Sequence, residues 1–260
     1  MLCFSFPDLH REARVNVALR RTYRVVADGE PHERNGAEAS IQLRHVDDFA
    51  DKVPKLWRDQ GGVMAPLHGA EALRVVFSGR YPFAIKIAAG RINALTLESW
   101  SNELHDNPQD YLVVPQTKSV DGFLVNDGLV RQFVAPLDDD TFMDRDAEMR
   151  GGMQIIAYPL RRELYERLED TSGERDAPSS GEPESDQQLE TQESPIIAAS
   201  NPRGFITQAF EPDLFGIDAW NQEHSNRCFI HIASARSWFS ITGENSPTGP
   251  FSPSDSFGRD

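Results

Sequence analysis

"VDGFLVNDGLVRQFVA", residues 120–135, is the stretch that decides the fold class of this chain. Two apolar runs flank Asn126, Asp127 and Gly128, which are residue types that accept the positive φ angles of a tight β-turn. The flanking Val, Leu and Phe residues are typical of β-strands. The stretch therefore predicts an antiparallel β-hairpin.

Segments on both sides of this hairpin carry the same signal. Residues 13–26 alternate between apolar and polar side chains, so Val15, Val17 and Leu19 share one face of a strand. Residues 71–79 and 82–90 predict two further strands, joined by a Gly-Arg-Tyr-Pro turn as a second hairpin. Short β segments also precede and follow residues 120–135.

Helical spacing occurs in two places. Apolar residues of the stretch 46–60 recur at nearly helical intervals despite Pro54, and leucines recur every four residues in the stretch 159–170. The prediction is an α+β fold that is β-rich, with mostly antiparallel strands and hairpins and a few short helices.

The charge is unevenly distributed along the chain. The formal net charge is −15, and residues 168–194 alone hold nine acids against one arginine, with no aromatic side chain. Such a composition cannot bury enough apolar surface to offset chain entropy. We therefore predict a disordered acidic insertion over residues 168–200, with a solvated spacer favoured over a regulatory or partner-binding segment.

The rest of the chain has the composition of one domain. We predict that residues 1–167 and 201–243 form one α+β domain, because the segment after the insertion is too short to bury a core alone. Residues 244–260 are rich in Ser, Pro and Gly, and predict a flexible C-terminal tail.

Charge and hydropathy limit the partners and the location. An acidic chain is poorly suited to neutralise phosphates, which argues against nucleic acid and anionic membranes as partners. There is no signal-peptide pattern, and no window approaches the roughly 18 apolar residues of a membrane-spanning helix. Only Cys3 and Cys228 are present, which excludes a disulfide framework. We expect a cytoplasmic protein with two free thiols.

Several stretches together resemble a family of uncharacterised proteins from bacteria and fungi. They are residues 82–100, 108–115, 120–135, 151–155 and 215–244. The resemblance covers most of residues 7–165 and 202–244, and it implies no activity or cofactor. Family members carry a further aromatic C-terminal segment, where this chain continues with "NSPTGPFSPSDSFGRD".

The stretch "RCFIHIAS", residues 227–234, places a cysteine and a histidine close together. As a strand it separates Cys228 from His231 on opposite faces, whereas as a helix it would bring His224, Cys228 and His231 together as three zinc ligands. The β-branched and aromatic residues favour the strand. We therefore predict packing roles and no metal, with this metal site and a catalytic Cys–His pair as alternatives.

Two cations and two aromatic residues mark a candidate ligand site. Lys86 lies between two isoleucines on a predicted strand, and with Arg91, Trp100 and Tyr111 it could bind a small anionic or polar ligand. The plainer alternative is that Lys86 faces water from a half-solvated sheet. Residues 99–111 are also dense in acids and aromatics, which suggests a sugar or small polar ligand, or simply a loop closing over a hairpin edge.

Common catalytic and nucleotide motifs are absent from the sequence, including HExxH, GxSxG, GxGxxG and GxxxxGK[ST]. We therefore predict a soluble β-rich binding or interaction module with no cofactor, whose partner is a small ligand or a protein. The alternative is an enzyme, either a hydrolase or a metal-dependent enzyme, whose acidic and histidine residues converge only in three dimensions.

Overall fold

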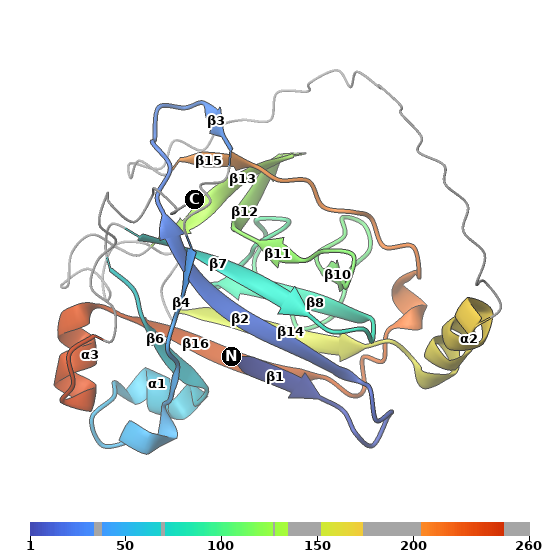
Figure 1. Ribbon diagram of the computed structural model, residues 1–260, viewed down its shortest axis with the longest axis horizontal. Helices are drawn as coiled ribbons and strands as arrows, with labels where there is room; N and C mark the ends of the chain where they lie inside the picture. Colours follow the sequence, from blue (N-terminus) through green and yellow to red (C-terminus); the bar gives the residue numbers. More distant parts are fainter. Residues whose placement is uncertain (34–37, 69–70, 127, 135–151, 174–203, 247–260) are drawn as a thin grey trace, which may run out of the picture.

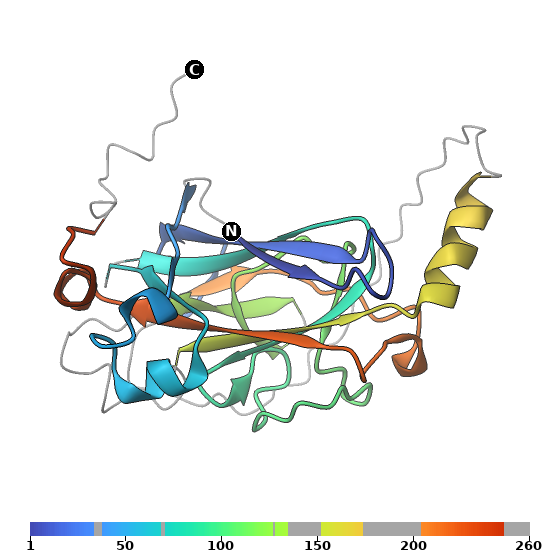
Figure 2. The same cartoon turned by 90° about the horizontal axis from the view of Figure 1, so that it is seen from below.

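Two β-sheets packed face to face make up most of the described chain in the computed structural model (Figure 1). The structure describes residues 1–33, 38–68, 71–126, 128–134, 152–173 and 204–246. In Figure 2, the blue and cyan strands of one sheet lie above the yellow and orange strands of the other. The β-rich α+β prediction is confirmed, since both sheets are mostly antiparallel.

The first sheet contains nine strands within the described residues. Its main order is β1, β2, β7, β13, β15, β3, with β4 beside β2, β11 beside β7 and β12 beside β13. β15 and β3 pair in parallel. The bounds are β1 Leu2–Ser5, β2 Arg14–Tyr23, β3 Pro31–His32, β4 Glu38–Ser40, β7 Glu71–Ser78, β11 Ser119–Val120, β12 Gly122–Asn126, β13 Leu129–Val134 and β15 Phe205–Thr207.

The second sheet contains seven strands within the described residues. Its order is β10, β8, β14, β16, β6, β5, with β9 beside β8, and β16 pairs in parallel with β6. The segment after the acidic stretch thus supplies an interior strand of this sheet. The bounds are β5 Arg44–His45, β6 Val63–Pro66, β8 Phe83–Ala89, β9 Ile92–Asn93, β10 Leu112–Val114, β14 Met153–Pro159 and β16 Asn226–Ala233.

The core lies between the sheets and follows the period-two alternation of the strands. Val15, Val17 and Leu19 of β2 are buried as predicted, and they belong to the same apolar cluster as Ile85 of β8 and Ile230 of β16. Burying apolar side chains from both sheets in one layer is the main stabilising contribution of such a sandwich.

The hairpin predicted over residues 120–135 is confirmed. β12 and β13 pair antiparallel with a register shift between Leu124 and Asn126, and Gly128 has a φ of +77°. At the other end of the hairpin, the backbone of Arg131 approaches Gly122 so closely that an added Cβ would lie 1.9 Å from its carbonyl oxygen. Only glycine fits there.

The second predicted hairpin is wrong. β7 and β8 are strands, but they belong to different sheets, so the turn between them carries the chain across the sandwich. Tyr81 explains this outcome, because it is buried and its hydroxyl donates a hydrogen bond to the carbonyl of Leu160 (2.8 Å). The turn is therefore anchored in the core beside the end of β14, whereas a hairpin turn would lie in solvent.

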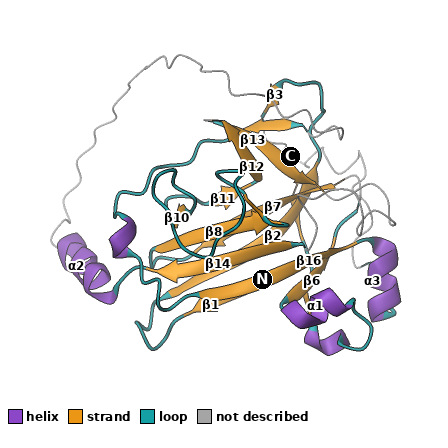
Figure 3. Ribbon diagram, turned by 180° about the vertical axis from the view of Figure 1, so that it is seen from behind, coloured by secondary structure: helices purple, strands orange, loops and turns teal. Residues whose placement is uncertain are grey.

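The helices lie at the two ends of the sandwich, α2 at one end and α1 and α3 at the other (Figure 3). The helical stretch predicted over residues 46–60 is split into the 3-10 turn η1 (Asp47–Phe49) and α1 (Lys55–Gln60), and Pro54 is the residue before α1. A second 3-10 turn, η3, spans Ile217–Ala219. Within the described residues, no helix is long and apolar enough to cross a bilayer.

The other two helices flank the acidic stretch and the end of the fold. α2 spans Arg162–Gly173, so the predicted helix with leucines at every fourth residue is present. It extends past residue 168, where the predicted disordered insertion begins. Residues 174–200 lie outside the described part. The sequence patterns did not predict α3 (Ala235–Thr242), which Ser234 caps and which Gly243 ends; residues 247–260 of the predicted tail are also outside the described part.

Gly122 and Gly128 allow a test of the hairpin. Gly122→Ala should lower the free energy of unfolding by at least about 2 kcal/mol, because the new Cβ collides with backbone that cannot move independently. Gly128→Asn should cost less than about 1 kcal/mol, since its Cβ would meet open space and asparagine tolerates positive φ. Urea unfolding measures both, and equal losses would contradict the assigned register.

Candidate functional site

The outer face of the second sheet carries the polar side chains that could form a site. Gln154 of β14 stands opposite Ala88 of β8 on one side and Phe229 of β16 on the other. Because strand side chains alternate, Lys86, Phe229 and neighbouring Arg227 face outward with Gln154, away from the apolar layer between the sheets. Two other parts of the chain cover the two sides of this face.

A loop between β9 and β10 covers β8. Lys86 is fully buried beneath it, and its ammonium forms an ion pair with Asp110 (2.6 Å). The ammonium also donates hydrogen bonds to Ser101 Oγ (3.2 Å) and to the carbonyl of Glu103, and lies 5.3 Å from the ring centroid of Trp100. The expectation that Lys86 faces water is therefore wrong, because the loop closes over it.

His105 extends this network at the surface. Its Nδ1 lies 2.8 Å from Asp110 Oδ2, and its backbone N–H donates to Asp110 Oδ1 (3.0 Å). Three of the residues that made the stretch 99–111 look like a sugar site are thus engaged here, His105 with Asp110, and Asp110 and Trp100 with Lys86. They hold the loop in place.

Helix α1 covers the opposite side of the face. Trp57 stacks on His231 of β16 with ring centroids 4.8 Å apart, and His231 Nε2 lies 2.9 Å from the carbonyl oxygen of Gly61, so Nε2 carries the proton. His231 is fully buried, and burial lowers its pKa below the ordinary value, more than the Gly61 contact raises it. His231 is therefore neutral near pH 7.

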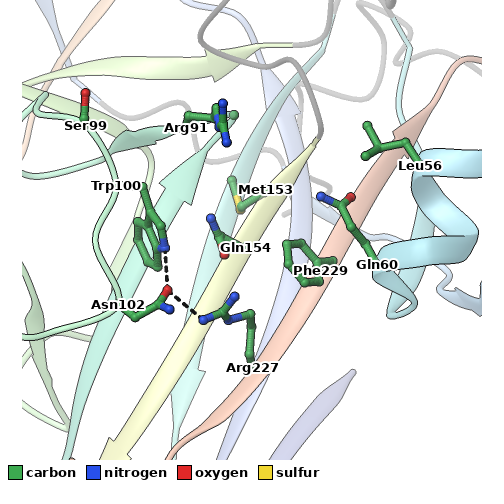
Figure 4. Close-up of a pocket in the computed structure, with 11 residues that line it drawn as sticks. Leu56, Gln60, Arg91, Ser99, Trp100, Asn102, Met153, Gln154, Arg227 and Phe229 are labelled. Atoms are coloured by element: carbon green, nitrogen blue, oxygen red, sulfur yellow. Dashed lines mark hydrogen bonds between the residues drawn. The ribbon is translucent and has the colours of Figure 1, made fainter.

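A cavity of about 650 Å³ lies between the loop and α1 (Figure 4). Its volume is typical of small-molecule sites. Its described lining comprises two guanidinium groups, two aromatic rings, three amides and several smaller or apolar groups: Arg91, Arg227, Trp100, Phe229, Gln60, Asn102, Gln154, Leu56, Met153, Gly90 and Ser99.

The charge of this lining is positive. No carboxylate occurs among the described lining residues, and the guanidinium of the exposed Arg91 makes no hydrogen bond or ion pair with the described part of the chain. Arg227 donates to Asn102 Oδ1 (2.7 Å) and lies 5.8 Å from the ring centroid of Phe229. Both guanidinium groups keep donors available for an anion.

Asn102 holds two lining groups at once. Its Oδ1 accepts hydrogen bonds from Arg227 and from Trp100 Nε1 (2.9 Å), as the dashed lines of Figure 4 show. Its carbonyl accepts a hydrogen bond from the Tyr158 hydroxyl of β14. The loop is thereby attached to the outer face, and Trp100 and Arg227 are oriented before any ligand arrives.

Two buried amide oxygens of the lining lack partners in the described chain. Gln154 is 8% exposed and its Oε1 accepts no hydrogen bond, and Gln60 Oε1 is likewise buried and unpaired. A buried acceptor without a donor costs about 1–3 kcal/mol. Both side chains point toward the cavity in Figure 4.

The structure brings together some of the residues predicted as a ligand site. Arg91 and Trp100 line the cavity, and Lys86 lies under Trp100. Tyr111 does not join them, because its hydroxyl donates to Asp213 Oδ2 (2.6 Å), which also accepts from Trp220 Nε1 (2.8 Å). Burial, followed by the Asp213 contact, raises the pKa of Tyr111 well above its usual range.

The metal alternative is not supported by the geometry. β16 is the predicted strand, so Cys228 packs against the core while His231 faces outward, and His224 is exposed beside Asn221 (3.2 Å). Burial raises the pKa of the Cys228 thiol to about 11. Among the described residues, no three His, Cys, Asp or Glu side chains are grouped so that they could hold a metal ion.

Sequence reasoning missed Arg227, Phe229, Gln154 and Asn102. The alternation of "RCFIHI" does place Arg227 and Phe229 on the face of His231, so part of the signal was present. Nothing local to the sequence shows that Gln154 becomes their neighbour, because that depends on the pairing of β14 with β16.

A second cavity, of about 730 Å³, lies beside the edge strand β1. Its lining includes Asp47, and its Arg44 is already paired with Glu244 (3.0 Å). Arg227 lines both cavities, but the second one adds an acid, Asp47, and its phenyl ring, Phe4, is buried in the core. The cavity on the outer face of the second sheet is therefore the stronger candidate.

Comparisons with protein-family models, with curated proteins and with solved structures find no match for this chain. The resemblance to a bacterial and fungal family stays a prediction.

The Lys86–Asp110 pair can be tested by a double-mutant cycle. Lys86→Met should lower the free energy of unfolding by about 3–5 kcal/mol, because it leaves the largely buried carboxylate of Asp110 without its ammonium. Lys86→Met combined with Asp110→Asn buries no charge and should recover more than half of that loss. Urea unfolding of the four proteins measures the coupling; purely additive losses would contradict it.

His231 predicts a pH effect on stability. Its pKa is lowered in the folded protein, so the unfolded chain takes up the proton first as the pH falls through about 6.5. The wild type should therefore lose stability between pH 8 and pH 5 relative to His231→Gln, by up to about 1.4 kcal/mol per pH unit below that point. Thermal or urea unfolding across this range measures it, and parallel pH profiles would refute it.

Proposed function

We propose that this protein is a binding module that holds a small anionic molecule in the cavity on the outer face of its second sheet, without catalysing a reaction. One observation carries the proposal: two guanidinium groups, Arg91 and Arg227, line the cavity, and no carboxylate does so within the described chain. In a chain with a net charge of −15, this is a local reversal of sign. Guanidinium groups bind carboxylates and phosphates through paired hydrogen bonds.

The chemistry of the lining supports binding over turnover. Its groups are hydrogen-bond donors, amides and aromatic faces, which orient a ligand and supply contact area. Ser99 is the one hydroxyl among the described lining residues, and no histidine, lysine or carboxylate is among them to act as its base.

The proposal predicts an arginine-dependent ligand. In a thermal-shift screen of small carboxylates, phosphates and sulfonates, a compound at about 100 times its Kd should stabilise the protein by about 2.7 kcal/mol. Arg91→Ala and Arg227→Ala should each weaken binding by about tenfold or more, as measured by titration calorimetry.

Arg20→Ala is the matched control, since Arg20 lies on the first sheet and donates to Ser40 there. It should leave the affinity unchanged. A screen without a hit, or a hit that neither cavity arginine affects, would disprove the proposal. Chemical turnover of a bound hit would show that the protein is an enzyme.

A further inference from the structure

The two arginines of the cavity lining come from opposite ends of its floor. Arg91 follows Gly90, whose N–H donates to the carbonyl of Gly152 just before β14 begins. Arg227 stands opposite Ile156, the fourth residue of β14. At about 3.3 Å per residue, the step from Gly152 to Ile156 separates the arginines by about 13 Å along β14. Because β14 lies between β8 and β16, they are also about 10 Å apart across the sheet.

The two guanidinium groups are therefore separate binding points. Both residues are exposed, and Arg227 is fixed by its hydrogen bond to Asn102 Oδ1 (2.7 Å). In Figure 4 the Trp100 ring lies at a level between the two guanidinium groups. A carboxylate that pairs with one guanidinium through two parallel hydrogen bonds uses both of its oxygens. Each arginine thus requires an anionic group of its own.

No third charge lies between these two ends. Lys86 is behind Trp100, but it is fully buried, and its ammonium is already engaged by Asp110, Ser101 and the carbonyl of Glu103. No other charged residue occurs in the described lining. The middle of a bound molecule would therefore meet uncharged groups.

Two of these uncharged groups are large, apolar and accessible. Trp100 is half-buried on the loop side, and Leu56 of α1 is 51% exposed on the opposite side. Covering such side chains with apolar atoms removes their surface from water and stabilises the complex. An apolar chain that runs from one arginine to the other would do so.

These features together define one class of molecule. We infer that the ligand is an elongated dianion, in which an apolar chain joins two anionic groups and each group pairs with one of Arg91 and Arg227. The inference rests on the proposed function and narrows its ligand from any small anion to a dianion with separated charges. Dicarboxylates and molecules with two phosphate-like groups share this chemistry, and a cavity of about 650 Å³ accommodates either.

Matched probes test charge and length by titration calorimetry. Adipate, suberate and sebacate place two carboxylates progressively further apart, and each is compared with the monocarboxylate of the same carbon number. Succinate keeps both carboxylates but holds them close together. Octane-1,8-bisphosphonate and octylphosphonate form the corresponding phosphonate pair. Whichever pair binds more tightly identifies the anionic group.

The second anionic group should strengthen binding because its pairing is intramolecular once the first has formed. The tightest of the longer dianions should bind about tenfold or more tightly than its matched monoanion, and succinate should lack this advantage.

Substitution of the arginines shows whether they act separately. Arg91→Ala and Arg227→Ala should each weaken the dianion by about tenfold, whereas at least one of them should leave the monoanion within about twofold, because a monoanion can pair with the arginine that remains. Arg227→Lys keeps the charge and a donor for Asn102, so it should retain most of the preference for the dianion. Arg20→Ala, on the first sheet, should change neither affinity.

The possible failures separate the two proposals. A monoanion that binds as tightly as its dianion, or that loses tenfold with either arginine substitution, would show that both arginines hold one anionic group, and overturns the inference. Succinate that equals the longer dianions overturns it too. In those cases arginine-dependent binding of the anion leaves the proposed function standing. If no anion binds at all, both proposals fall.

Discussion

Lys86 is a charged side chain with no exposed surface, in the middle of a strand that is buried along its whole length. An ammonium there is tolerated only if acceptors surround it, and the loop between β9 and β10 supplies them through Asp110, Ser101 and the carbonyl of Glu103. The dependence is mutual: the ammonium of Lys86 needs the acceptors of the loop, and the loop is held on the sheet by its bonds to this ammonium. The same arrangement supports Trp100, which lies over Lys86 and forms one wall of the cavity.

The opposite wall of the cavity depends on a second buried polar residue, the neutral His231. His231 projects from the same face of the sheet and is buried under α1, where stacking on Trp57 and a hydrogen bond to Gly61 replace the contacts with water. Two polar residues on one sheet face are thus covered by two separate segments. The strip of the sheet between Lys86 and His231, over β14 and the first half of β16, is left accessible. The cavity lies there because the β9–β10 loop covers one side of the face and α1 covers the other.

The charge of the cavity lining differs in sign from that of the whole chain. The chain is strongly acidic, and its overall field repels polyanions. Within the cavity, however, the described lining holds two guanidinium groups and no carboxylate. A small anion in the cavity lies close to these guanidinium groups in partly desolvated surroundings. Their attraction for it is therefore stronger than the repulsion from the acidic surface, which is more distant and screened by salt. Acidity of the whole chain and selection of an anion by one site are therefore compatible.

Local sequence determined much of the architecture. Alternation defined β2 and β16, and the Asn126–Gly128 turn defined the hairpin, because strand faces and tight turns depend on residues a few positions apart. Tertiary structure decided the rest. The sequence suggested a hairpin for β7 and β8, yet Tyr81 anchors their connection in the core and sends them to different sheets. Arg91 and Trp100 were identifiable as candidates, but Gln154 and Arg227 join them only through the pairing of β14 with β16. A strand's pattern specifies which side chains share its face, whereas the strand that lies beside it is chosen by contacts between residues far apart in the chain.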